Sequence, residues 1–173
     1  SAATCEFLLD KDKNFYFIEV NTRIQVEHTI TEMITDQDLV QWQIRVAAGE
    51  PLTLRQEDIS ITGHAMECRI NAEDPERGFS PSPGQLSKFI PPGGLGVRID
   101  THMYQGAMVS PYYDSMIGKL IVHKKDRQAT INTMKRALRE FRIEPIKTTI
   151  PAHLEILSHN LFVNSRIDTR SEE

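Results

Sequence analysis

Two apolar runs near the start of the chain, residues 4–9 and 15–20, constrain its fold most strongly. Both are rich in Phe, Leu, Ile, Tyr and Val, and a short polar segment separates them. Aromatic and β-branched runs on either side of polar turn residues are typical of paired strands. The sequence therefore predicts a β-hairpin with a polar turn.

The register of this hairpin decides which acidic side chains meet. If the turn is centred between Asp12 and Lys13, Glu6 lies opposite Glu19, and like charges placed opposite each other destabilise a sheet. A divalent cation would offset the repulsion, because hard ions such as Mg²⁺ bind carboxylate and amide oxygens. Asn21 lies on the same face as Glu19 and adds an amide oxygen. A slip of one residue would undo the pairing, so the predicted metal site depends on the register.

The alternation of polar and apolar residues continues after Glu19 in the run E-V-N-T-R-I-Q-V-E-H. An extended chain would present Arg23, Gln25 and Glu27 along the same edge. Such an edge combines a metal site, a guanidinium that can bind a small oxyanion with two parallel hydrogen bonds, and a carboxylate that can act as a base. The solvated face of an amphipathic strand shows the same alternation and is commoner, so periodicity alone leaves both interpretations open.

Composition argues against several classes of protein. The net charge of -4 argues against a broad surface for nucleic acid or anionic membranes. No apolar run approaches the ~18 residues of a membrane span. The two cysteines, Cys5 and Cys68, form no C-x-x-C motif, which favours a reducing, cytoplasmic compartment. The start at Ser1 lacks the pattern of a signal peptide, and an apolar run follows at once, which suggests a piece of a longer chain.

The rest of the chain predicts further strands and helices. One helix is expected from about Asp36 to Ala48, and another from a cap at Asp126 to about Phe141. A half-buried strand is expected from Gly63. Shorter elements are expected as strands at 86–90, 97–102 and 116–123 and as a helix at 151–158. The order of strands, helix, strands and helices predicts an α+β fold with a mainly antiparallel sheet.

Several long motifs follow one another along the chain. They are F-Y-F-I-E-V-N-T-R-I-Q-V-E-H at 15–28, T-E-M-I-T at 31–35, Q-I-R-V-A-A-G-E-P-L at 43–52, G-H-A-M-E-C-R-I-N-A-E-D-P at 63–75, S-P-S-P-G at 80–84, P-P-G-G-L-G-V-R at 91–98 and P-Y-Y-D-S-M-I-G-K-L at 111–120. In this order they resemble the C-terminal part of biotin carboxylases, which belong to the ATP-grasp group. The resemblance extends nearly to the end of the chain and is greatest to the biotin carboxylase subunit of bacterial acetyl-CoA carboxylase.

The resemblance implies roles in binding ATP and metal. Glu6 and Glu19, with Asn21, are expected to bind the Mg²⁺ or Mn²⁺ ions that bridge the ATP phosphates. Leu8 corresponds to a side chain that lines the adenine pocket.

The resemblance also implies a bicarbonate site. Arg23 is expected to bind bicarbonate, and Gln25 and the backbone of Val26 to complete that pocket. Glu27 is expected to deprotonate bicarbonate as the general base. Arg69 is expected to stabilise the enolate-like biotin anion.

A structural alternative exists for Arg69. Its guanidinium could instead form a salt bridge with Glu67 or Glu73.

The implied reaction is the ATP- and bicarbonate-dependent carboxylation of biotin on a carrier protein, the first half-reaction of acetyl-CoA carboxylase in fatty acid synthesis. Residues 1–50 would end the ATP-grasp domain, 51–165 would form the C-terminal domain, and 166–173 a loose tail. The implied partners are the N-terminal and lid domains of the enzyme, the biotin carboxyl carrier protein and the carboxyltransferase. Leu95 and Arg98 fall where the family forms its homodimer contact.

The chain departs from the family pattern in places. Thr29 stands where the family usually has Pro, and Leu95 where bacterial members often have Phe. The N-terminal domain, the glycine-rich lid and the lysines that hold ATP and bicarbonate are missing, so the isolated chain is expected to be inactive. The alternatives are a part of pyruvate or propionyl-CoA carboxylase, a non-catalytic dimerisation module, and another ATP-grasp ligase that shares only the metal site.

Overall fold

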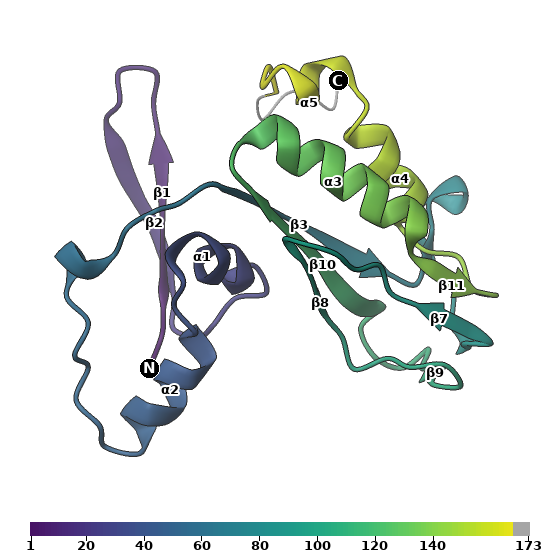
Figure 1. Ribbon diagram of the computed structural model, residues 1–173, viewed down its shortest axis with the longest axis horizontal. Coiled ribbons are helices and arrows are strands. Elements are labelled where there is room, and N and C mark those ends of the chain that lie inside the picture. Colours follow the sequence, from purple (N-terminus) through teal and green to yellow (C-terminus); the bar gives the residue numbers. More distant parts are fainter. Residues whose placement is uncertain (168–173) are drawn as a thin grey trace. The chain divides into compact units, whose positions relative to one another are not determined.

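The computed structural model describes residues 1–167, and its contacts divide the chain into two compact units, Ser1–Thr62 and the part from Gly63 onward. Each unit is described by itself (Figure 1). Residues 168–173, most of the predicted loose tail, lie outside the described residues. Every strand pairing in the described part is antiparallel, which confirms the predicted α+β class with a mainly antiparallel sheet.

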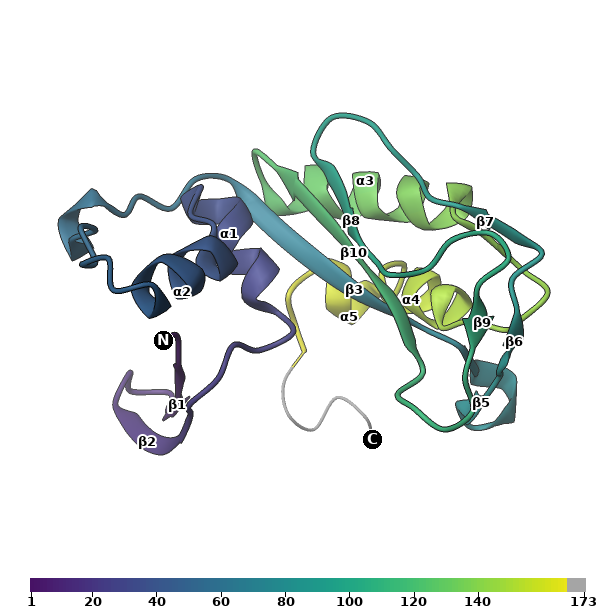
Figure 2. The ribbon, with the colours of Figure 1, turned by 90° about the horizontal axis from the view of Figure 1, so that it is seen from below.

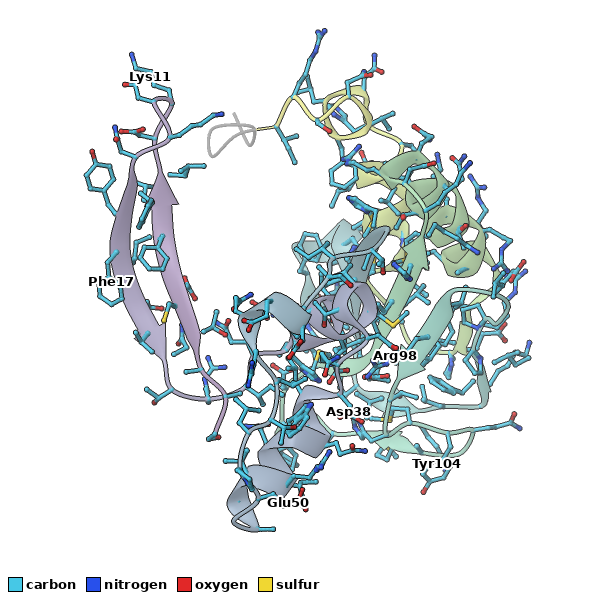
Figure 3. All side chains as sticks on the ribbon, turned by 60° about the vertical axis from the view of Figure 1, so that its left-hand side comes forward. Lys11, Phe17, Asp38, Glu50, Arg98 and Tyr104 are labelled. Carbon is cyan, nitrogen blue, oxygen red and sulfur yellow. The ribbon has the colours of Figure 1, made fainter. Side chains whose placement is uncertain are left out.

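The first unit opens with the predicted β-hairpin, formed by β1 (Thr4–Leu9) and β2 (Phe15–Asn21). Asp10 and Asn14 close its turn, because the backbone N–H of Asp10 donates to the carbonyl of Asn14 at 2.9 Å. The carboxylate of Asp10 accepts the backbone N–H of Asn14 in return, also at 2.9 Å. Lys11 lies at the tip of the hairpin (Figure 3).

The predicted pairing of Glu6 with Glu19 is confirmed, but the register changes by one residue between Glu6 and Phe7. Beyond that point Phe7 pairs with Phe17, so Ile18 is an extra residue and forms a β-bulge in β2. The register predicted from a turn of two central residues is therefore wrong by one from Phe7 to the turn. The reason is that the turn holds an odd number of residues.

The bulge separates two kinds of side chain onto opposite faces of the hairpin. The ring of Phe7 meets the edges of Phe15 and Phe17, with centroids 5.6 and 5.9 Å apart. Glu6 precedes Phe7 on β1 and therefore points to the other face. On a regular strand, Phe17 and Glu19 would point to the same face. Because Ile18 is an extra residue between them, Glu19 points instead to the face away from the aromatic cluster.

Two helices follow, α1 (His28–Thr35) and α2 (Leu39–Ala47). The helix predicted from about Asp36 to Ala48 is confirmed as α2, although its cap is Asp38, and α1 was not predicted. Asp36 takes a left-handed conformation (φ 57°) and ends α1, and the carboxylate of Asp38 caps α2 by accepting a backbone N–H at 2.7 Å. The α1 sequence is rich in β-branched Thr and Ile, which have low helix propensity.

The second unit is built on a three-stranded sheet in the order β3 (His64–Asn71), β10 (Met116–Lys124), β8 (Val97–Asp100). Helix α3 (Arg127–Glu140) lies along β10 and β3, as Figures 1 and 2 show, and the carboxylate of Asp126 caps it as predicted. The buried core lies between this sheet and the helices. It includes Cys68, Ile70, Leu120, Val122, Ile131, Met134 and Leu138.

The other face of the same sheet carries charge. Arg69 on β3 pairs across the sheet with Lys119 on β10, which pairs with Asp100 on β8. Two more charged residues, Glu67 and Arg98, occupy the next row on the same face. The predicted strand with one apolar and one polar face is therefore confirmed.

Short elements complete the chain. They are η1 (Gln56–Asp58), β4 (Glu73–Asp74), η2 (Pro75–Arg77), β5 (Ser80–Pro81), β6 (Gly84–Gln85), β7 (Lys88–Ile90), β9 (Met108–Val109), β11 (Arg142–Glu144), α4 (Ile150–Ile156) and α5 (Asn160–Val163). Among the described residues, no helix is both long and apolar enough to cross a membrane.

Candidate functional site

Four of the predicted site residues meet on one face of the hairpin. The amide nitrogen of Asn21 donates to Oε1 of Glu6 at 2.9 Å and to Oε1 of Glu19 at 3.1 Å. The amide nitrogen of Gln25 donates to the same oxygen of Glu6 at 3.1 Å. The two carboxylates therefore converge on one point, where hydrogen-bond donors offset their repulsion.

This donor set is suited to a hard cation. Two carboxylates and the oxygen of an amide are ligands that Mg²⁺ accepts, and so few protein ligands leave positions for phosphate oxygens. Asn21 would have to turn its amide so that Oδ1, and not the nitrogen, faces the ion. Among the described residues, no group of three or more His, Cys, Asp or Glu side chains could hold a metal, so a cation here would depend on the amide and on substrate oxygens.

The predicted edge does not stay extended beyond Asn21. Strand β2 ends there, and Val26 and Glu27 form a turn that leads into α1. One guanidinium nitrogen of Arg23 donates to the carbonyl of Ile24 at 3.2 Å. The predicted extended edge therefore ends at Asn21, because the chain bends before the first turn of α1, although Gln25 still reaches Glu6.

Leu8 lies on β1, and its side chain is 58% exposed. An exposed aliphatic side chain in this place is available to form part of the wall of a site for an apolar group such as a purine ring.

Arg69 belongs to the second unit, on the charged face of the sheet. Its Nε lies 3.9 Å from Oε1 of Glu67, so one of the salt bridges that the sequence offers as an alternative is present, at the long end of the usual range. The side chain of Glu67 is only 6% exposed, whereas that of Arg69 is 51% exposed. The guanidinium therefore keeps a solvent-facing side that an anionic ligand can reach.

The carbonyl of Arg69 accepts two hydrogen bonds that sequence reasoning missed. They come from the hydroxyl of Thr149, at 3.0 Å, and from Nε2 of His153, at 2.8 Å. Both residues lie about eighty positions further along the chain, and no spacing or motif links them to Arg69.

The predicted interface residues lie at the edge of the second unit. Arg98 binds Asp100 with two parallel hydrogen bonds of 2.7 Å each. Leu95 lies in the turn before β8 and is 90% exposed. A large apolar side chain with this exposure is available for contact with another molecule.

Two groups have shifted acidity. Burial, together with a smaller effect of the negative charge of Glu67, raises the pKa of the Cys68 thiol to about 12. The side chain and backbone of Asn14 lower the pKa of the Asp10 carboxyl by donating hydrogen bonds to its charged form. Neither group belongs to the predicted site, and both serve the fold.

Two family models match the chain, one in each unit. The Biotin carboxylase C-terminal domain matches residues 67–171. The ATP binding domain of the Carbamoyl-phosphate synthase L chain matches residues 1–55, which contain the Glu6–Glu19 pair.

Similar proteins are considerably longer than this chain. Biotin carboxylase 1 of Bacillus subtilis is 54% identical over 170 residues, which cover 98% of this chain and 38% of that protein. One of the pyruvate carboxylase subunits of Methanothermobacter thermautotrophicus is also 54% identical, over 98% of this chain and 34% of its own length. The chain thus spans less than two-fifths of these relatives.

Solved structures agree. The biotin carboxylase domain dimer of the Hydrogenobacter thermophilus 2-oxoglutarate carboxylase, in complex with MgADP, ADP and bicarbonate, superposes with a TM-score of 0.92. It is 48% identical over 97% of this chain and 37% of that one. The match to the family model, the sequence identities and the fold all agree: the chain belongs to the biotin carboxylase family and carries its C-terminal domain.

Proposed function

We propose that this chain forms part of the active site of a biotin carboxylase, which uses ATP and bicarbonate to carboxylate biotin on a carrier protein. The observation that carries the proposal is the convergence of Glu6, Glu19, Asn21 and Gln25 within the segment that matches an ATP-binding domain. Arg69, on the unit that matches the biotin carboxylase C-terminal domain, supplies the group for biotin.

The carboxylate pair and Asn21 would hold Mg²⁺ or Mn²⁺ with ATP, and the cation would supply charge neutralisation at the phosphates when bound. Leu8 would contribute to the adenine pocket. These residues thus orient the γ-phosphate for attack. Positioning and charge neutralisation are the main contributions that a protein makes to phosphoryl transfer.

Arg23 would bind bicarbonate through its two parallel N–H groups, with Gln25 and the backbone of Val26 completing the pocket. Glu27 accepts the proton of bicarbonate, and an oxygen of the resulting carbonate attacks the γ-phosphate. The bond from the γ-phosphorus to ADP breaks, and carboxyphosphate forms. Carboxyphosphate then breaks down to CO₂ and phosphate.

The phosphate removes the N1 proton of biotin, and the biotin anion forms a bond to CO₂. Arg69 would stabilise the negative charge on the ureido oxygen of that anion, because a guanidinium donates to an oxyanion in the plane of its fork. The products are carboxybiotin, ADP and phosphate.

The first unit supports the inference that the remainder of the enzyme, its N-terminal and lid domains, docks here. The rings and aliphatic side chains of β1 and β2 are exposed on both faces, and a two-stranded sheet alone is marginal in water. A mostly apolar groove of about 380 Å³, lined by Ala2, Leu39, Trp42, Val46 and Leu52 among others, lies beside the first residues. We expect the isolated chain to be inactive without those domains.

The test is a chimera in which this chain replaces the matching 38% of Bacillus subtilis biotin carboxylase 1. The chimera should hydrolyse ATP when bicarbonate is present and should carboxylate biotin, whereas the isolated chain should do neither. The substitution Glu27→Gln should lower the carboxylation rate by about 100-fold or more, because it removes the base. A chimera without biotin carboxylation, although it is folded and binds ATP, would refute the proposed function, and an unchanged rate in Glu27→Gln would refute the role of Glu27.

The parent enzyme would serve acetyl-CoA carboxylase in fatty acid synthesis, in the cytoplasm, together with a biotin carboxyl carrier protein and a carboxyltransferase. A place in pyruvate or propionyl-CoA carboxylase is the alternative, and the similarity to one of the pyruvate carboxylase subunits keeps it open. The domain boundaries at 50 and 165 stay predictions. Purified chimera supplied with carrier and carboxyltransferase from each system would identify the acceptor by the labelled acid formed from bicarbonate.

A non-catalytic role as a dimerisation module is a second candidate. The exposure of Leu95 beside Arg98 favours it, as does the dimer of the related 2-oxoglutarate carboxylase domain. Light scattering of the isolated chain and of Leu95→Ser tests it. A dimer that the substitution dissociates supports the contact, and a monomeric parent chain excludes it.

A further inference from the structure

The edge of β3 that faces away from β10 is held by residues of one short segment. Among the described residues, β3 pairs with no second strand. Its outward backbone groups at Arg69 and Asn71 bond instead to Thr149 and to His153, one helical turn later in α4.

Thr149 acts as a substitute for a neighbouring strand. Its backbone N–H donates to the carbonyl of Asn71 at 3.0 Å. Its hydroxyl accepts the N–H of Asn71 at 3.1 Å and donates to the carbonyl of Arg69 at 3.0 Å. Thr149 is almost fully buried, so a side chain without a hydroxyl would leave both backbone groups without this partner.

His153 supplies the second bond to the same carbonyl. A carbonyl oxygen only accepts, so Nε2 of His153 carries the hydrogen in this 2.8 Å contact. With Thr149 and His153 both donating, the two lone pairs of the Arg69 carbonyl are satisfied. The peptide group after Arg69 is thereby fixed in orientation from one side, while β10 fixes the strand from the other.

We propose that Thr149 and His153 are positioning residues for Arg69, which aim its guanidinium at the biotin anion. The inference rests on the proposed function of Arg69. Helix α4 is anchored independently, because Ile150, Leu154 and Leu157 pack against the core. A long arginine side chain magnifies any tilt of its backbone, and a productive site tolerates only about 0.5 Å of displacement.

The experiment compares two rates in the chimera: biotin carboxylation, and bicarbonate-dependent ATP hydrolysis without biotin. Thr149→Val and His153→Ala should lower the ratio of the first rate to the second by about 10- to 100-fold, because misplacement of about 1 Å has effects of that size. His153→Gln should restore the ratio toward the parent value, since its amide keeps an N–H at a similar reach. In Thr149→Val and His153→Ala, the fold-increase in the KM for biotin should be smaller than the fold-decrease in kcat.

His159→Ala is the matched control. His159 also forms a hydrogen bond with the backbone, in which its Nδ1 accepts the N–H of Leu161, but it bonds to no backbone group of β3. Its ratio should equal that of the parent. If the Thr149 and His153 variants lower both rates equally, these residues only cap the sheet, and the proposal fails.

Arg69→Ala separates this proposal from the proposed function. If Arg69→Ala keeps biotin carboxylation, the assignment of Arg69 fails, and the positioning role with it. If Arg69→Ala abolishes biotin carboxylation while Thr149→Val and His153→Ala leave the ratio of the two rates at the parent value, only the positioning proposal fails.

Discussion

Gly63 illustrates how a single backbone position controls the second unit. It precedes β3 with φ +65°, a region that L side chains rarely adopt. A Cβ atom there would lie 2.5 Å from Nε2 of His123 and 2.5 Å from the carbonyl oxygen of Lys124. The start of β3 therefore approaches the end of β10 more closely than any larger residue permits.

Gly63→Ala should destabilise the chain far more than Gly78→Ala. Gly78 has a similar φ, +60°, but a Cβ atom there meets nothing within 4 Å. Both variants lose about 1–2 kcal/mol from the left-handed conformation. Gly63→Ala adds a steric cost of about 1–3 kcal/mol. Urea denaturation measures the difference, and equal losses would show that β3 and β10 separate at no cost.

The two cysteines should differ in reactivity. Cys5 is exposed on β1, whereas Cys68 is buried and its pKa is raised to about 12. A thiol reagent at pH 8 should therefore modify one thiol quickly, and Cys5→Ser should remove that phase. Two fast thiols in the native chain would contradict the burial of Cys68.

Alkaline pH should weaken the fold through the same thiol. Below its ordinary pKa of 9.0, Cys68 is neutral in both the folded and the unfolded chain. Above 9.0 the thiolate forms first in the unfolded chain, so the free energy of unfolding falls as pH rises toward 12. Denaturation as a function of pH measures this fall, which Cys68→Ala should reduce.

At the scale of elements, the bulge at Ile18 sets which side chains share a face of the hairpin. Deletion of Ile18 should leave Glu6 opposite Glu19, because a regular ladder from Phe7–Phe17 brings that pair next in register. The rate of ATP hydrolysis by the chimera should then stay within a few-fold of the parent. Deletion of Val20 is the control, since it turns Asn21 to the other face and should lower the rate at least tenfold. If both deletions lower the rate of ATP hydrolysis equally, the bulge itself is needed.

Sequence predicted the elements whose pattern is local. The hairpin, β3, β10 and α3 have regular periodicity and clear turn or cap residues, so their predictions hold. Helix α1 was missed because its β-branched residues suit a strand better than a helix. The bulge was missed because the sequence does not show whether the turn holds an even or an odd number of residues. That number follows only from the closing pair, Asp10 and Asn14.

The candidate site was predictable only in its local part. Glu6 lies directly opposite Glu19, and Asn21 follows Glu19 by two residues, so hairpin geometry brings the three side chains together. The bend after Asn21 depends on the start of α1, which the alternation conceals. The partners of the Arg69 carbonyl come from a distant helix, and only the packing of α4 on the core brings them to β3.

At the scale of the whole molecule, the two units differ in how much apolar surface they bury. The buried apolar residues of the described part run from Cys68 to Leu157, all in the second unit. In the first unit, the buried side chains are those of Thr29 and Glu32. The second unit therefore has a core of its own, whereas the apolar side chains of the first unit are half-buried or exposed.

Amide hydrogen exchange should show this difference directly. In the isolated chain, amides of β3, β10 and α3 should be protected, and those of β1 and β2 should exchange quickly. In the chimera, the hairpin should become protected as the docked domains cover it. A hairpin that is equally protected in both proteins would contradict the proposed docking of the missing domains.

The exposed hairpin also has a consequence for how the chain behaves in solution. Phe17 is 61% exposed, and Figure 3 shows it directed away from the ribbon. The outer edges of β1 and β2 carry backbone groups that pair with no other strand of the described part. Apolar strands with open edges are templates for the addition of further strands, and Lys11 and Lys13 lie in the turn of the hairpin and not along these edges. Expressed without a covering domain, this hairpin is the segment at which the chain should aggregate first.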